Sequence, residues 1–381
     1  MHGVTSREIR KTQGSSRVRC PHLEWTENKA LRQKLIDLLL TPAEEAESIE
    51  RICGELGDWR DFFDLARREG LLGIVADRIM PHAPAGERRP LAQTVAMQNL
   101  AALRQTLNLR EVLSALEARR IPCVALKGLL LAERLYPRPS ARVCVDIDLL
   151  IPPADLPAAA AALSDIGYHK ARPTFDDLAT PARHHLCLVR PRSAAVELHH
   201  RVTAVLGSVI EAGPFLSRSI PYRSASGIST RVLEPEDEFL QLAVRTVADR
   251  FALLRLYDLK LFMQRHRDLR WETISSRARE TGFNTPVFLA AWALDKIMLE
   301  PGPAAGLDVR PNPLAARHAE RVVSGLSAST RSSPRRHSPR YLACKGIACD
   351  RPLTGAGVYV LDWLGLPWRY VHLRLADRRL P

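Results

Sequence analysis

Two aspartates, Asp146 and Asp148, interrupt an otherwise apolar and β-branched stretch of the sequence. Side chains of a β-strand alternate between its two faces, so residues two apart project from the same face. The stretch therefore predicts a strand with Val145, Ile147 and Leu149 in a core and with both carboxylates on the opposite face, roughly 7 Å apart. Such carboxylates repel each other unless a cation lies between them or one is protonated. Mg²⁺, which prefers oxygen ligands and phosphates, is the expected cation; the alternative is a frayed strand end without a metal.

A candidate phosphate-binding turn lies upstream of the two aspartates. Ile121 to Leu126 is a short apolar run that predicts a strand, and Leu129 to Tyr136 has the spacing of an amphipathic helix. The turn between them, Lys127-Gly128, would present backbone N–H groups and a helix N-terminus to an anion. Lys127 adds a cation at the same place. Both residues are therefore candidate phosphate ligands, although a lysine that merely reaches into solvent is the alternative.

A third carboxylate lies on a strand predicted at residues 194–200. In this strand Val196 and Leu198 share one face, whereas Glu197 and His199 share the other. Glu197 could complete a three-carboxylate site with the two aspartates. The alternative is an edge strand with a polar outer face.

The sequence also holds two adjacent histidine pairs, His184-His185 and His199-His200. Neither pair is accompanied by a second pair at the compact spacing of structural zinc sites, so the spacing does not favour zinc. If the strand around Glu197 had the opposite register, the third catalytic group would lie elsewhere, with Asp176 or Asp177 as the next candidates.

These segments together resemble the bacterial uncharacterised nucleotidyltransferase family, a branch of the DNA polymerase beta-like nucleotidyltransferase superfamily. The likeness spans about residues 30 to 300. It is carried by Ala125 to Ala132, Leu135-Tyr136-Pro137, Arg142, Asp146 to Ile151 and Val196 to His199, and by helical segments at Trp59 to Ile74, Pro235 to Phe239 and Leu256 to Leu259.

The resemblance implies an α+β fold. In it, a polymerase-beta-like catalytic core, with a mixed sheet and helices, is flanked by helical N- and C-terminal lobes. By the same resemblance, Asp146, Asp148 and Glu197 would hold two Mg²⁺ ions. One ion would activate an acceptor hydroxyl for attack on the α-phosphate of a nucleoside triphosphate, expected to be ATP, and the other would stabilise the pyrophosphate leaving group.

The triphosphate itself would be held by Lys127, the Gly128 amide and Arg142, whose guanidinium fork suits phosphate oxygens. The sequence departs from the wider superfamily in this loop, because Lys127-Gly128 stands in place of a Gly-Ser pair and no serine hydroxyl follows. Many family members also carry a histidine in the helix after the Pro-Glu-Asp motif. This chain has none there, and Arg245 and Arg250 are the polar candidates.

The acceptor is not evident from the sequence. Members of the family often accompany gene sets for peptide natural products or polysaccharides, so a small molecule or a peptide is expected. One alternative is a toxin-like transferase that acts on a protein or tRNA, which the net charge of +13 favours. The other is a catalytically silent nucleotide-binding or interaction protein of the same fold, against which the three intact carboxylates argue.

Composition restricts the class of protein. With 381 residues, 46% hydrophobic and 25% charged, the chain can bury a sizeable core. No apolar run approaches the roughly 20 residues that span a membrane, so no membrane partner is expected. The basic N-terminus lacks the apolar core of a secretory signal. Seven scattered cysteines are typical of free thiols in a reducing cytoplasm.

Apolar spacing near 3.6 residues predicts helices at Leu31 to Leu40, Ala43 to Leu56, Trp59 to Arg68, Leu91 to Leu116 and Ala154 to Leu163. Five regions follow from these patterns. They are a disordered basic N-terminus (1–24), a helical lobe (25–118), the catalytic core (119–232), a second helical lobe (233–330), and a basic linker with a C-terminal tail (331–381).

Overall fold

The structure is a computed structural model that describes residues 24–171, 184–205, 208–300, 302–311, 313–326 and 350. The predicted N-terminal segment before Glu24 lies outside the described residues, and so do Asp176 and Asp177. The predicted basic linker and C-terminal tail also lie outside them, except for Asp350.

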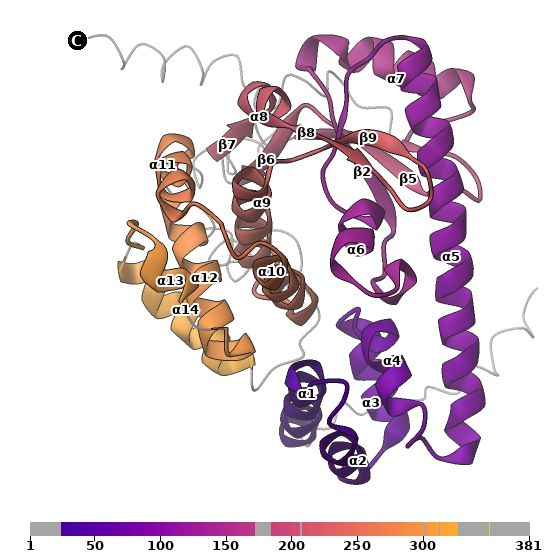
Figure 1. Cartoon of the computed structure of the whole chain (residues 1–381), viewed down its shortest axis with the longest axis vertical. Helices are drawn as coiled ribbons and strands as arrows, with labels where there is room; N and C mark the ends of the chain where they lie inside the picture. Colours follow the sequence, from indigo (N-terminus) through magenta and orange to yellow (C-terminus); the bar gives the residue numbers. More distant parts are fainter. Residues whose placement is uncertain are drawn as a thin grey trace, which may run out of the picture.

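Four short helices and one long helix form the N-terminal part of the molecule (Figure 1). They are α1 (Glu24–Leu40), α2 (Ala46–Gly54), α3 (Trp59–Arg68), α4 (Leu72–Ile79) and α5 (Ala85–Ala118). The Asp58 side chain caps α3 by accepting hydrogen bonds from the backbone N–H groups of Arg60 and Asp61. Helix α5 runs from the small helices along the side of the sheet, and its Leu91 and Leu109 belong to two different hydrophobic clusters. It therefore joins the helical part to the sheet.

The centre of the molecule is a seven-stranded mixed sheet with the strand order β3-β4-β5-β2-β1-β9-β8. The strands are β1 (Val124–Ala125), β2 (Asp146–Leu150), β3 (His169–Lys170), β4 (His185–Val189), β5 (Ala195–His199), β8 (Ile220–Arg223) and β9 (Ser229–Val232). Strands β2 and β5 are parallel neighbours, and β4 pairs with β5 in the antiparallel sense. The connecting elements are α6 (Leu129–Leu135), α7 (Leu156–Asp165), α8 (Ala212–Arg218), the 3₁₀ turns η1 (Pro139–Ala141) and η2 (Pro153–Asp155), and the separate hairpin β6 (Arg201–Val205) with β7 (Ser208–Glu211).

The two faces of this sheet differ in polarity. Ile147, Leu149, Val196 and Leu198 are buried in one hydrophobic cluster with residues of α5 and α7, whereas Asp148 belongs to the opposite face by strand alternation. The predicted alternation is therefore confirmed for β2 and β5. It fails at Val145, which was expected in the core and is 73% exposed, because β2 begins only at Asp146.

The C-terminal helices form a layer in which α9 and α10 are nearest to the polar face of the sheet, and the others pack around α9 and α12 (Figure 1). They are α9 (Pro235–Ala248), α10 (Leu253–Arg265), α11 (Trp271–Thr281), α12 (Asn284–Met298), α13 (Pro303–Gly306) and α14 (Pro313–Leu326). Pro235 is at the start of α9, as the sequence predicts. The acids that follow it bind distant arginines: Glu238 accepts two hydrogen bonds of 2.6 Å from Arg134 of α6. This pair fixes α9 against α6, the helix that follows β1.

The predicted α+β class, a mixed sheet with helices at both ends of the chain, is confirmed. The five predicted region boundaries stay predictions. None of the helices in the described part of the chain has the length and apolarity that a bilayer crossing needs.

Candidate active site

Asp148 and Glu197 lie side by side on the polar face of the sheet. The parallel pairing of β2 with β5 aligns Asp148 with Glu197 and Asp146 with Ala195. Neighbouring strands are only about 4.8 Å apart, so this register brings together two carboxylates that are far apart in the sequence. Ligand atoms of Asp148, Glu197 and His199 all lie within 4.8 Å of one another. This group of three has the size of a metal site.

Asp148 is buried and surrounded by cationic partners. Its Oδ1 lies 2.9 Å from Lys127 Nζ and 2.9 Å from His199 Nε2. Burial alone would raise the pKa of this carboxyl, but Lys127 and His199 outweigh it and hold the pKa far below its usual range. Asp148 Oδ2 is also buried and has no hydrogen-bond partner among the described residues. One oxygen is therefore satisfied by the protein, whereas the other is left for something else.

Asp146 is half-buried at the start of β2. Burial raises its pKa, and the charge of Asp148 raises it further. Its carboxylate is not part of the group formed by Asp148, Glu197 and His199, although strand alternation places it on the same face. Its backbone carbonyl accepts a hydrogen bond of 2.7 Å from Gln105 of α5. The carboxylates of Asp148 and Glu197 thus meet directly, whereas Asp146 lies two residues before Asp148 on the same strand.

Gly128 makes the turn between β1 and α6 in a conformation that few other residues adopt. Its φ is +74° and its ψ is −134°, a region that L-residues with a side chain populate only with strain. A Cβ at this position would also lie 3.4 Å from the carbonyl oxygen of Asp146. The glycine thus lets the Lys127 turn pass close to β2, which brings Lys127 within reach of Asp148.

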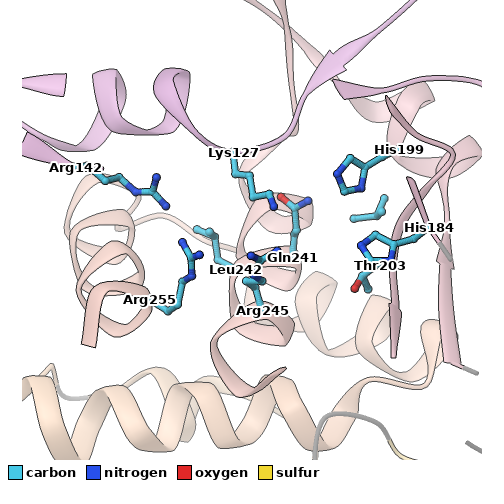
Figure 2. Close-up of a pocket in the computed structure, with 10 residues that line it drawn as sticks. Lys127, Arg142, His184, His199, Thr203, Gln241, Leu242, Arg245 and Arg255 are labelled. Atoms are coloured by element: carbon cyan, nitrogen blue, oxygen red, sulfur yellow. The ribbon is translucent and has the colours of Figure 1, made fainter. Parts of the chain in front are cut away.

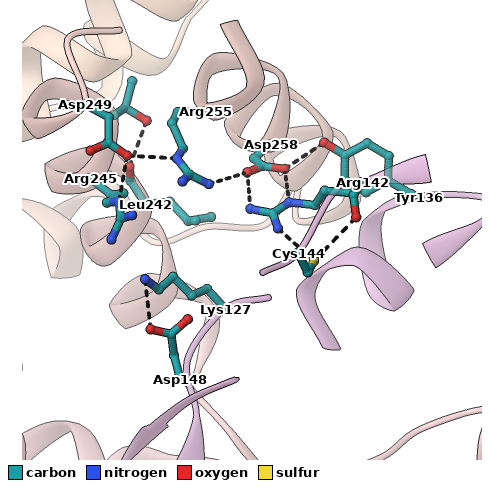
Figure 3. A network of polar contacts seen from close by, with 11 residues as sticks. Lys127, Tyr136, Arg142, Cys144, Asp148, Leu242, Arg245, Asp249, Arg255 and Asp258 are labelled. Carbon is teal, nitrogen blue, oxygen red and sulfur yellow. Dashed lines mark hydrogen bonds and ion pairs between the residues drawn. The ribbon is translucent and has the colours of Figure 1, made fainter. Parts of the chain in front are cut away.

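Arg142 is buried and bound to another protein group (Figure 3). Its Nε and one terminal nitrogen each lie 2.7 Å from an oxygen of Asp258 on α10. The Tyr136 hydroxyl donates to the same carboxylate at 2.7 Å. The guanidinium fork predicted to bind phosphate is therefore engaged by Asp258, and a direct contact of Arg142 with a triphosphate stays a prediction.

A pocket opens beside these groups, between the sheet and helices α9 and α10 (Figure 2). It encloses about 460 Å³, open solvent included. Its lining residues are Lys127, Arg142, His184, His199, Val202, Thr203, Gln241, Leu242, Arg245 and Arg255. In Figure 2, Lys127 lies between the histidines on one side and Arg142 and Arg255 on the other. The pocket thus offers several cationic side chains close to the carboxylates.

The arginines of the C-terminal helices were only partly foreseen. Arg245 of α9 was a candidate and lines the pocket, whereas Arg250 lies beyond the end of α9 and does not. Arg255 was missed, although it directly precedes the Leu256 to Leu259 segment that carried part of the family resemblance. Both Arg245 and Arg255 bind Asp249, at 2.7 and 3.0 Å.

The family model of the uncharacterised nucleotidyltransferases matches residues 55–298. The chain belongs to this family. The match contains every predicted site residue as well as the pocket arginines. Among solved structures, the chain is similar to the antibiotic-resistance factor ANT(2'')-Ia in solution, with 14% identity and a TM-score of 0.31 over 46% of this chain and 92% of that chain. None of the curated proteins matches the chain.

As a nucleotidyltransferase, the protein transfers a phosphorus-containing group, and the charges of its pocket suit such a reaction. Carboxylates at the sheet can hold a metal ion, while Lys127 and the arginines can neutralise phosphate oxygens. Burial would lower the pKa of Arg245, but Asp249 outweighs this, and Asp148 and Asp146 add to the rise. The carboxylates beside the pocket thus favour the charged form of Arg245 before any substrate binds.

Proposed function

We propose that this nucleotidyltransferase uses Mg²⁺ to transfer a nucleoside monophosphate from a nucleoside triphosphate, expected to be ATP, to an acceptor hydroxyl. One observation carries the proposal: Asp148 and Glu197 are aligned on neighbouring strands, next to a pocket lined by lysine and arginine. Carboxylates beside phosphate-binding cations are what a metal-dependent transfer of a phosphorus group requires.

The residues present fit Mg²⁺. Oxygen ligands are those that this ion prefers, and the buried Oδ2 of Asp148 has no hydrogen-bond partner among the described residues. Asp148, Glu197 and Asp146 would hold the metal. Bound there, Mg²⁺ would supply charge neutralisation for both the attacking and the leaving oxygens of the displacement. All other steps fall to side chains of the chain itself.

Lys127 would have two partners in turn. In the structure it compensates the buried charge of Asp148 at 2.9 Å, a task that a metal ion could take over. Its ammonium group also lines the pocket, so a modest rotation of a flexible four-carbon side chain would direct it to the phosphates. Arg245 and Arg255 face the same space and would neutralise the β- and γ-phosphates.

In the proposed reaction, the acceptor oxygen attacks the α-phosphorus while the bond from this phosphorus to its bridging oxygen breaks. Pyrophosphate leaves with the bonding electrons, and the acceptor hydroxyl loses its proton. Glu197 is half-buried at 20% side-chain exposure, so it is accessible to an acceptor and suited to receive that proton. Lys127 and the arginines stabilise the charge on the departing pyrophosphate.

The direct experiment follows the phosphates with two labels. The protein, Mg²⁺ and each of four nucleoside triphosphates are incubated with candidate acceptors, once with an α-label and once with a γ-label. The proposal expects the α-label in the acceptor and the γ-label in pyrophosphate. A γ-label in the acceptor would instead indicate phosphoryl transfer, and no label in any acceptor together with no triphosphate binding would indicate the catalytically silent alternative.

The acceptor class is part of the same experiment. A small molecule or a peptide is the expected acceptor, and tRNA or a protein, which the net charge of +13 favours, is the other arm. The four cysteines among the described residues, Cys53, Cys123, Cys144 and Cys187, are free thiols. This supports the proposal that the enzyme works in the cytoplasm.

A further inference from the structure

Three histidines from two strands meet beside the carboxylates. The antiparallel pairing of β4 with β5 sets His185 opposite His199, and His184 directly precedes β4. The ring centroids of His184 and His185 are 4.6 Å apart, and those of the other two pairs are 5.3 and 5.1 Å apart. One nitrogen from each ring lies within 4.8 Å of the other two.

We propose that His184, His185 and His199 form a binding site for a zinc-like transition-metal ion, distinct from the magnesium site proposed at the carboxylates. Three imidazoles with a fourth position open to water are a ligand set that Zn²⁺ takes in proteins. Mg²⁺ prefers oxygen ligands, so the two groups select different metals by their chemistry.

The carboxylate contacts of two of these histidines match those of metal ligands. His199 Nε2 lies 2.9 Å from Asp148, and His185 Nε2 lies 3.5 Å from Glu197. The Nδ1 atoms of both rings are buried and have no hydrogen-bond partner among the described residues. A carboxylate that binds one imidazole nitrogen while the metal takes the other is the usual arrangement around a protein-bound zinc ion. Both rings thus have a donor nitrogen left for a metal.

The distances require the three rings to approach one another. In a tetrahedral site with Zn–N bonds of about 2.0–2.1 Å, two ligand nitrogens are roughly 3.4 Å apart. One nitrogen of each ring already lies within 4.8 Å of the other two. Rotation of the imidazoles about their side-chain bonds would close the remaining gap without a change in the strand pairing.

The test uses the full chain and metal ions alone, without nucleotide. After treatment with a chelator, the protein is titrated with Co²⁺, followed by its visible absorption, and with Zn²⁺ in a calorimeter. One ion per chain is expected. His184→Ala and His185→Ala should each weaken binding by about a hundredfold or more, since loss of a direct ligand costs more than the 10–100-fold typical of a supporting group. His169→Ala, at an exposed histidine on neighbouring β3, is the matched control and should bind like the wild type.

Asp146→Asn separates this site from the carboxylate site, because Asp146 is one of the proposed magnesium ligands and does not belong to the group of three histidines. It should retain Co²⁺ and Zn²⁺ binding. The proposal is overturned if the wild type binds neither ion, or if His184→Ala and His185→Ala bind as well as the wild type. It is also overturned if Asp146→Asn loses the ion while the histidine variants keep it. Circular dichroism checks the fold, and His184→Gln replaces His184→Ala if the latter unfolds.

The titration needs no triphosphate, so its failure would leave the proposed nucleotidyl transfer standing. Conversely, an enzyme that transfers no nucleotide could still bind Zn²⁺ at these histidines. The two proposals therefore fail separately.

Discussion

Arg142 and Asp258 join the segment before β2 to helix α10 through two hydrogen bonds of 2.7 Å each. The two residues are 116 positions apart in the sequence, and both side chains are almost completely buried. Burial alone would lower the pKa of Arg142, but Asp258 holds it well above its usual value. The pair thus fixes one wall of the pocket against the catalytic strand.

Arg142→Ala should destabilise the fold strongly, because it leaves the Asp258 carboxylate buried without its main counter-charge. Breaking such a pair costs about 3–5 kcal/mol, measured as the free energy of unfolding in urea. The control is Arg67→Ala, which removes an exposed pair with Asp64 and should cost under about 1 kcal/mol. An Arg142→Ala protein of wild-type stability that no longer binds ATP would instead indicate the direct phosphate contact predicted from the sequence.

Lys127→Ala should weaken ATP binding more than adenosine binding, because it removes a cation that faces the phosphates. The expected loss is about 1–3 kcal/mol for a charge-assisted contact, measured by calorimetry with Mg²⁺ present. Lys34→Ala is the matched control, since Lys34 pairs with Glu55 outside the pocket. Equal ATP affinity of the Lys127 variant and the wild type would mean that Lys127 serves Asp148 alone.

Glu197→Gln should reduce turnover by about a hundredfold or more, the usual scale for the loss of a proton acceptor. ATP affinity should change little, because the phosphates are bound mainly from the Lys127 side. Pyrophosphate release measures the effect, with Glu111→Gln as control, since Glu111 pairs with Arg190 away from the pocket. Wild-type turnover in Glu197→Gln would require a third catalytic group elsewhere, with Asp176 and Asp177 as the next candidates.

The contribution of His199 to stability should decrease as the pH rises. Burial would lower its pKa, but the hydrogen bonds to Asp148 and Glu197 outweigh burial and the nearby charge of Lys127, so the folded-state pKa is raised. A histidine whose pKa is higher in the folded state stabilises the fold fully at pH values below its unfolded-state pKa of about 6.5. This stabilisation is lost as the pH rises through its folded-state pKa. The lowered pKa of Asp148 keeps its carboxylate ionised throughout.

The effect is measured as the free energy of unfolding in urea, for the wild type and for His199→Gln. The pH range is about 6 to about 9, which begins near the unfolded-state pKa of histidine. The difference in unfolding free energy should be largest at the acidic end and should shrink toward the alkaline end. His184 and His185 also face His199, and burial lowers the pKa of both, which favours their neutral forms. A difference that grows with pH would mean that His199 is neutral in the folded protein.

The alternation of side chains explains why much of the site was predictable from the sequence. The expected apolar residues of β2 and β5 are buried, namely Ile147, Leu149, Val196 and Leu198. The acidic residues therefore lie on the opposite face of these two strands. Alternation also placed Glu197 and His199 on one face, and the parallel register then aligned Glu197 with Asp148. The exact strand start was not predictable, because Val145 is as apolar as the residues of the core.

Contacts between distant segments could not be predicted in this way. Nothing near Arg142 in the sequence signals Asp258, and a buried arginine that binds a carboxylate has the same local pattern as one that awaits a phosphate. The histidine cluster is similar, since zinc spacing rules search for compact pairs, whereas His184, His185 and His199 meet through strand pairing. Arg245 and Arg255 lie on helices, and no pattern in the nearby sequence predicts how these helices pack against the sheet.

The central claim, a metal-dependent triphosphate site built on Asp148, is tested most directly by thermal unfolding with and without ligands. In the wild type, Mg²⁺ and a nucleoside triphosphate together should raise the melting temperature, because a ligand that binds only the folded state stabilises it. Asp148→Asn should stay folded and should show no such Mg²⁺-dependent rise. If this variant keeps the full Mg²⁺-dependent increase, Asp148 does not bind the metal and the account is contradicted.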